Sequence, residues 1–164
     1  METMENRIVA AARGWLGTRF HHQGRLKAGI HDRGGVDCLG LLVGVAAELD
    51  LRDAAGAPLS ALDVPDYGHL PDGVALRAAL EAHLAPADAI EPGRILLLAP
   101  DGAPRHLAIV GASGTGLTLI HAYAQARRVV EHALDGWWRE KVAAAFSVPE
   151  QEESVVFSSL RAVP

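Results

Sequence analysis

One cysteine and two histidines are the residues of this sequence whose types and spacing suggest chemistry. Cys38 lies in the segment GGVDCLGL, which spans residues 34–41. Asp37 is a residue type that favours the N-cap of a helix, so Cys38 is predicted in the first helical turn. Free amide N–H groups and the positive end of the helix dipole favour a thiolate there. The thiolate is the reactive form of cysteine, so Cys38 is a candidate nucleophile.

A buried structural role is the alternative for Cys38. Free cysteine is among the most buried residue types and commonly packs as a small apolar side chain. The two interpretations differ in one requirement, because a nucleophilic thiol needs a base beside it. The histidines therefore decide between them.

His106 and His121 occupy the ends of two apolar segments. His106 precedes LAIV at residues 107–110, and His121 follows LTLI at residues 117–120. If residues 111–116 join these segments as a hairpin, the two imidazoles lie side by side. One ring can then take the thiol proton while the other orients it. Taken singly, each histidine is equally well explained as a polar strand end facing water.

The elements that must position these residues follow from periodicity. Met4, Ile8, Ala11 and Trp15 predict a first helix ending near Gly14 or Gly17. Residues 17–35 are glycine-rich without an apolar period and predict a long loop. The predicted second helix begins after Asp37, residues 50–71 predict a surface connection, and a third helix spans 72–84. Strands are predicted at 95–99, 107–110, 117–121, 129–134 and 142–148. This order predicts an α+β fold with helices packed on one face of an antiparallel sheet of about five strands.

Composition excludes several classes of protein. The 164 residues carry a formal charge of −5, with 49% apolar and 21% charged residues. We therefore expect one globular domain over residues 1–149 and a C-terminal segment, 150–164, that is mobile or docks on a partner. The sequence has no basic cluster of the kind that binds nucleic acid. Its apolar segments are too short to cross a membrane. Neither nucleic-acid binding nor membrane insertion is therefore expected. The N-terminus is not typical of a signal peptide, so synthesis in the cytoplasm without export is expected.

A metal site is the remaining alternative for the loop histidines. A single cysteine excludes an internal disulfide and a multi-thiolate site. His21, His22, His31 and Cys38 are potential ligands, but their spacing matches no standard zinc site. No metal and no other cofactor is expected.

Several motifs together resemble the NlpC-type cell-wall cysteine peptidases. They are GTRF at residues 17–20, VDCLGL at 36–41, Pro-Gly at 92–93, HLAIV at 106–110 and IHA at 120–122. WLGT from Trp15, HQG from His22, DCLGL and the late GWW at 136–138 resemble more narrowly the branch carried by phage tails and gene-transfer particles. The similarity covers about residues 6–149.

The resemblance implies a reduced papain-like fold and hydrolysis of peptidoglycan stem peptides, typically between D-glutamate and the diamino acid, without a cofactor. Cys38 then matches the nucleophile, His106 the base and His121 the polar third residue. It also implies a virion-like tail component that acts at the cell wall beside tail hub or tail-tip proteins. A tail-tip structural or wall-binding module of the same fold, with weak or no turnover, is the alternative.

Two positions depart from the family pattern. Phe20 replaces a tyrosine whose hydroxyl is thought to help at the oxyanion, and Leu39 replaces the serine after the cysteine. His22 and Gln23 are candidate replacement donors. The candidate oxyanion and substrate-groove residues are Phe20, His22, Gln23, Asp37, Leu39 and Tyr67.

Overall fold

The computed structural model describes residues 1–63 and 73–151 of the chain. The helices are α1 (Met4–Arg13), α2 (Cys38–Glu48), α3 (Gly73–His83) and α4 (Gly136–Glu140), with 3₁₀ turns η1 (Leu59–Leu62) and η2 (Ala124–Ala126). The strands are β1 (Arg25–Leu26), β2 (Gly35–Val36), β3 (Ala85–Pro86), β4 (Ile95–Leu98), β5 (His106–Ser113), β6 (Gly116–Tyr123), β7 (Arg128–Ala133) and β8 (Val142–Ser147). Helices precede the main strands, so the predicted α+β class is confirmed.

The helices begin and end where their capping residues indicate. Thr3 accepts a hydrogen bond from the backbone N–H of Asn6 and starts α1, which ends at Gly14. The Asp37 side chain accepts from the backbone N–H of Gly40 and starts α2. Both contacts satisfy amide groups that the first turn leaves without a helical partner. The predicted end of the first helix and the predicted start of the second are therefore confirmed.

An antiparallel sheet of six strands has the order β3-β8-β4-β5-β6-β7. The five predicted strands are β4 to β8, and the sixth, β3, has only two residues. The β5–β6 hairpin pairs Ile109 with Ile120 and turns between Ser113 and Gly116. This register brings the end of β6 back beside the start of β5, as the sequence predicts.

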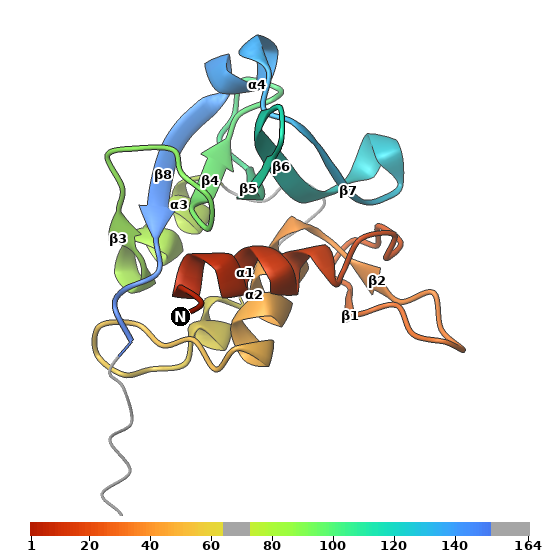
Figure 1. Cartoon of the computed structure of the whole chain (residues 1–164), viewed down its shortest axis with the longest axis horizontal. Coiled ribbons are helices and arrows are strands. Elements are labelled where there is room, and N and C mark those ends of the chain that lie inside the picture. Colours follow the sequence, from red (N-terminus) through yellow and green to blue (C-terminus); the bar gives the residue numbers. More distant parts are fainter. Residues whose placement is uncertain (64–72, 152–164) are drawn as a thin grey trace, which may run out of the picture.

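Alternating residues of the sheet enter two separate apolar cores. The larger core joins Leu97, Ile109 and Ile120 to α1, α2 and α3. The smaller core, on the other face, joins Leu96 and Leu119 to Trp138 of α4 and other residues. Figure 1 shows α1 and α2 together on one side of the sheet and α4 at the opposite end. The predicted packing of helices on one face holds for α1 and α2, whereas α4 covers part of the second face.

Three segments differ from the sequence-based expectations. The predicted surface connection over residues 50–71 contains buried Leu51, Leu59 and Leu62, which belong to the larger core. The predicted long loop contains the two-stranded ribbon β1–β2. Helix α4 was not predicted, because five residues are too few to establish an apolar period.

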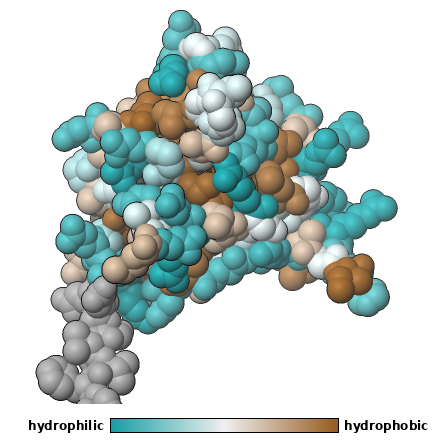
Figure 2. Space-filling view, viewed as in Figure 1, coloured by the Kyte–Doolittle hydropathy of each residue, from teal (hydrophilic) through white to brown (hydrophobic). Residues whose placement is uncertain are grey.

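The ends and surface of the described chain add three observations. Gln151 donates a side-chain hydrogen bond to the Arg52 carbonyl at 3.0 Å; residues 152–164, most of the predicted C-terminal segment, lie outside the described residues. No helix of the described residues is long and apolar enough to cross a lipid bilayer. Figure 2 shows a face on which hydrophilic residues surround several apolar patches, one of them at the tip of the β1–β2 ribbon. Ile30, in the segment between β1 and β2, is 96% exposed.

Candidate active site

The Cys38 thiol lies where the start of α2 meets the start of β5. Asp37 has the extended backbone of an N-cap, and Cys38 is the first helical residue. Cys38 as a residue is half-buried and packs against the larger core, and its sulfur receives a backbone hydrogen bond from Leu107, the residue after His106. The helix therefore delivers the thiol to the strand that begins with His106.

Burial dominates the acid–base chemistry of this thiol. Desolvation and then the negative charge of Asp37 raise the pKa of Cys38 to about 12, and backbone hydrogen bonds from Leu107 and Leu39 offset only part of that increase. The expectation of a thiolate at Cys38 is therefore wrong for this structure. A sulfur shielded from water loses more hydration energy on ionising than the helix N-terminus returns.

The raised pKa predicts slow alkylation of Cys38. With a pKa of about 12, roughly one thiol in 10⁴ is ionised at pH 8, against about one quarter for an ordinary cysteine. Iodoacetamide should react on the order of 10³-fold more slowly than with free cysteine. Because the thiolate fraction rises with pH, the rate should increase about tenfold per pH unit between pH 7 and 10. Mass spectrometry of the labelled protein measures this, and a plateau below pH 9 would contradict the raised pKa.

The Asp37 carboxylate holds the loop before β1 against the start of α2. It is 4% exposed and accepts hydrogen bonds from the backbone N–H of Gln23 at 2.9 Å and from that of Gly40 at 2.8 Å. Arg25 Nη1 donates to the same carboxylate at 2.9 Å and also bonds Asp63 through Nη2 at 2.9 Å. Asp37, a candidate groove residue, is therefore buried, and its carboxylate joins this loop to the start of α2.

Close backbone contacts reinforce this arrangement. A Cβ atom on Gly24 would lie 2.2 Å from the Gly35 carbonyl oxygen, and one on Gly40 would lie 2.2 Å from the Gly24 carbonyl oxygen. Such distances exclude any side chain, so these positions require glycine. Gln23, the residue before Gly24 in this loop, adopts a left-handed φ of 58°.

The candidate groove residues occupy different environments. His22 is half-buried and Gln23 is exposed, in the loop that Asp37 anchors. Phe20 packs against the larger core, and Leu39 is buried within it at 4% exposure. Leu39 therefore has a structural environment, whereas Tyr67 lies outside the described residues.

Two imidazoles meet across the β5–β6 hairpin, as predicted. His106 Nε2 and His121 Nδ1 are 2.6 Å apart, a hydrogen-bonding distance. His121 is fully buried, whereas His106 is partly exposed at the strand end. His106 therefore contacts His121 through Nε2, and its other ring nitrogen, Nδ1, takes no part in this contact.

A third histidine, which sequence reasoning missed, continues this chain. His132 Nε2 lies 2.7 Å from His121 Nε2, and His132 Nδ1 lies 3.0 Å from the carbonyl oxygen of Ala133. His132 belongs to β7, which pairs it with Leu119 of β6. Strand alternation could have found it, because His121 and Leu119 share one face and their neighbour on β7 must share it too.

Aromatic side chains surround the three imidazoles. Tyr123 stacks on His121 with centroids 5.0 Å apart, and the Trp138 ring meets His121 edge-on at 5.2 Å. Burial lowers the pKa of His106 to about 4, against a smaller opposing effect of the Asp101 charge. Burial and the two neighbouring histidines lower the pKa of His121 to about 2. Both rings are therefore neutral near pH 7.

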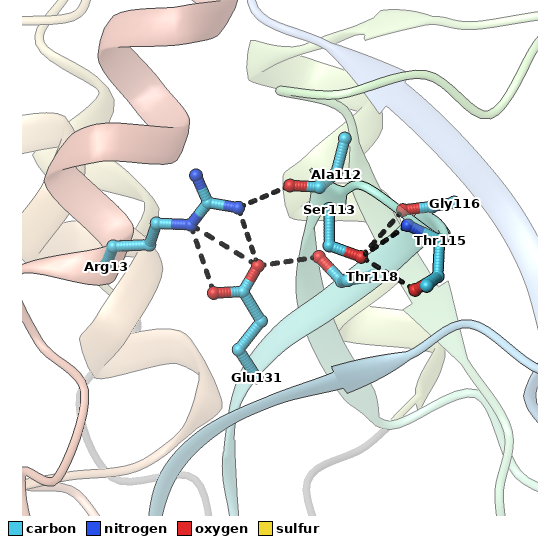
Figure 3. Close-up of polar contacts among 7 residues, drawn as sticks. All are labelled: Arg13, Ala112, Ser113, Thr115, Gly116, Thr118 and Glu131. Atoms are coloured by element: carbon cyan, nitrogen blue, oxygen red, sulfur yellow. Dashed lines mark hydrogen bonds and ion pairs between the residues drawn. The ribbon is translucent and has the colours of Figure 1, made fainter.

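A polar network attaches β7 to α1 on the other face of the sheet (Figure 3). Glu131 accepts three hydrogen bonds from Arg13, the shortest at 2.8 Å, and one from the Thr118 hydroxyl at 2.7 Å. Arg13 also donates to the carbonyl oxygen of Ala112 at 2.6 Å. The Arg13 hydrogen bonds hold the pKa of Glu131 below its usual range. This network holds the strand that carries His132.

The described residues do not assemble a metal site. Across residues 1–63 and 73–151, no three His, Cys, Asp or Glu side chains form a group that could hold a metal ion. His21 Nδ1 instead lies 2.9 Å from the carbonyl oxygen of its neighbour His22. The alternative site at His21, His22, His31 and Cys38 is therefore not assembled in this structure.

Comparison with known proteins gives matches in structure alone. No family model and no curated protein sequence matches the chain. The NlpC/p60 domain of the peptidoglycan hydrolase SagA is similar over 88% of this chain and 99% of its own, with 21% identity and a TM-score of 0.53. An NlpC/P60 family protein from Bacillus cereus is similar over 90% of this chain and 41% of its own, with 17% identity and a TM-score of 0.58.

An N-acetylmuramoyl-L-alanine amidase from Bacteroides uniformis is also similar. The match covers 87% of this chain and 96% of the amidase, with 13% identity and a TM-score of 0.51. At these identities the likeness shows the fold, which is that of NlpC/p60 domains. The fold implied by the sequence resemblance is therefore confirmed.

Proposed function

We propose that this protein is a peptidoglycan hydrolase that uses Cys38 as its nucleophile. One observation carries the proposal: the thiol at the start of α2 contacts the backbone of β5 one residue from His106, which is hydrogen-bonded to His121. Solved peptidoglycan hydrolases and amidases share the fold. A thiol, a neutral imidazole and an orienting group are the components of acyl transfer.

The proposed reaction begins with a neutral thiol. The raised pKa of Cys38 and the lowered pKa of His106 mean that proton transfer to His106 Nδ1 accompanies attack of sulfur on the scissile carbonyl carbon. The C–N bond then breaks, His106 returns its proton to the departing amine, and a thioester remains. Water, deprotonated by His106, attacks the thioester carbonyl carbon. The C–S bond breaks, the acid product leaves, and His106 returns the proton to the sulfur.

The substrate follows from the sequence resemblance. We propose that the bond between D-glutamate and the diamino acid of the stem peptide is cleaved. The structural likeness to an amidase makes the bond between the sugar lactyl group and L-alanine the competing choice. Both reactions release a new amino group, but from different fragments.

Defined muropeptides test the function and the bond together. After incubation with the protein, mass spectrometry should show fragments that begin with the diamino acid and one new free amine for each cleavage. Release of an intact stem peptide would instead identify an amidase. No fragment of either kind, from protein with native circular dichroism, would contradict hydrolysis.

A second candidate function is favoured by the thiol itself. A cysteine with a pKa of about 12 suits a wall-binding module of the same fold without turnover. Such a module would sediment with purified peptidoglycan in the muropeptide experiment while releasing nothing. Binding without release of fragments would therefore support the module, whereas release of fragments would support the hydrolase.

Delivery by a phage-like tail is the proposal for where the protein acts. The motifs that resemble the tail-borne branch support it, and residues 150–164 are the segment proposed to dock on a tail hub or tail-tip protein. Copurification of the full chain with tail particles, and its loss when residues 150–164 are removed, would support this proposal. Unchanged copurification of the shortened chain would contradict docking through this segment.

A further inference from the structure

We infer that His132 is a positioning residue that selects the tautomer of His106 through His121. The inference deepens the proposed function, because it concerns the base of the same site. It rests on three contacts in series: His106 to His121 at 2.6 Å, His121 to His132 at 2.7 Å, and His132 to the Ala133 carbonyl at 3.0 Å.

The chain of hydrogen bonds has a defined direction because one end is a carbonyl. The Ala133 oxygen can only accept, so the hydrogen in this contact belongs to His132 Nδ1. In a neutral imidazole one nitrogen donates and the other accepts. His132 Nε2 is therefore an acceptor.

The same rule then applies to the next two rings. His121 Nε2 faces the acceptor of His132 and must carry a hydrogen, which leaves His121 Nδ1 as an acceptor. His106 Nε2 faces that acceptor and must donate. His106 Nδ1 is left without a hydrogen, which is the form a base needs to take the thiol proton.

His121 alone cannot make this selection. With hydrogen on Nδ1 instead of Nε2, it would donate to His106 Nε2 and place the His106 hydrogen on Nδ1, where it blocks the base. Full burial between Tyr123 and Trp138 separates the His121 ring from bulk water. His132, the neighbour at its Nε2, therefore decides which form is present.

Two substitutions of His132 separate the hydrogen bond from the packing. His132→Phe keeps a ring beside Trp138, which lies 5.3 Å from the His132 centroid, but it removes the acceptor. His132→Gln places an amide oxygen near the position of Nε2 and restores an acceptor. His83→Phe is the matched control, because it removes a histidine of α3 that bonds Asp53, away from this chain.

Nitrogen NMR of ¹⁵N-histidine protein reads the tautomers directly. In the wild type, His106 and His121 should carry hydrogen on Nε2 and His132 on Nδ1. In His132→Phe, His121 and His106 should show a mixture of tautomers, and His132→Gln should restore the Nε2–H forms. The wild-type pattern retained in His132→Phe, or hydrogen on Nε2 of wild-type His132, would overturn the inference.

Kinetics on muropeptides give the second readout. His132→Phe should lower kcat by about 10- to 100-fold with KM unchanged, a part of what general-base catalysis contributes. His132→Gln should recover most of kcat, and His83→Phe should match the wild type. Equal losses in the Phe and Gln variants would show a packing role and overturn the inference. If the wild type releases no fragments, the proposed function fails, while the NMR pattern still tests the chain of histidines.

Discussion

The Cys38→Ala variant is expected to release no new amino groups from peptidoglycan, a loss of at least about 10⁴-fold in rate. The proposed reaction forms its covalent intermediate on this sulfur, and alanine offers no atom that can attack a carbonyl. Cys38 is the only cysteine in the chain, so no other thiol can replace it. Mass spectrometry of muropeptide fragments and a free-amine assay measure the loss.

The fold should survive this substitution. Cys38 as a residue is half-buried at the edge of the larger core, so removing one sulfur atom should cost about 1 kcal/mol of unfolding free energy. Val43→Ala, a half-buried truncation in the same helix, is the matched control and should retain activity. Hydrolysis by Cys38→Ala at the wild-type rate would eliminate Cys38 as the nucleophile.

The Asp37→Ala variant is expected to lose about 3 kcal/mol of unfolding free energy. The substitution removes the N-cap of α2 and leaves the Gln23 amide and the Arg25 guanidinium without this acceptor. A partly buried charge that loses its partner is more costly than a cap alone. Because α2 begins with Cys38, the thiol should also lose its defined position, and hydrolysis should fall. Urea unfolding followed by circular dichroism measures the stability.

Two further substitutions separate the charge from the cap. Asp37→Asn keeps an oxygen for the Gly40 amide but loses the charge opposite Arg25, so it should show an intermediate loss. Asp135→Ala removes the exposed N-cap of α4, which accepts from the backbone N–H of Trp138, and should cost about 1 kcal/mol. A loss in Asp37→Ala no larger than that in Asp135→Ala would show that the buried carboxylate contributes only as a cap.

Local rules predict most of the elements that carry the candidate site. Asp37 before an apolar segment identifies the start of α2, and two short apolar segments joined by glycines identify the β5–β6 hairpin. Each of these signals depends on residues that are close together in the sequence. The adjacency of His106 and His121 follows from them, because a hairpin converts sequence order into a cross-strand neighbour.

Features that depend on distant contacts are not predictable in this way. The high pKa of Cys38 reflects how completely the surrounding chain excludes water, and the apolar pattern of α2 does not measure that. The sequence around Leu59 is typical of a loop, and this residue becomes part of the larger core because η1 packs against α2. His132 acquires its contact with His121 only when β7 joins β6 in register.

Residues 17–20, at the start of the loop that precedes β1, also cover the outer edge of β7. β7 is an edge strand, and an edge strand with unpaired backbone groups can recruit a strand from another molecule and cause aggregation. Here the backbone of Gly17 and Thr18 bonds Val129, Phe20 bonds the Arg127 carbonyl, and the His132 ring occupies the Ala133 carbonyl. Association of another strand with the edge of β7 would therefore have to break two sets of contacts. One set belongs to the loop before β1, which Asp37 anchors at Gln23. The other belongs to His132, which is inferred to select the tautomer of His106.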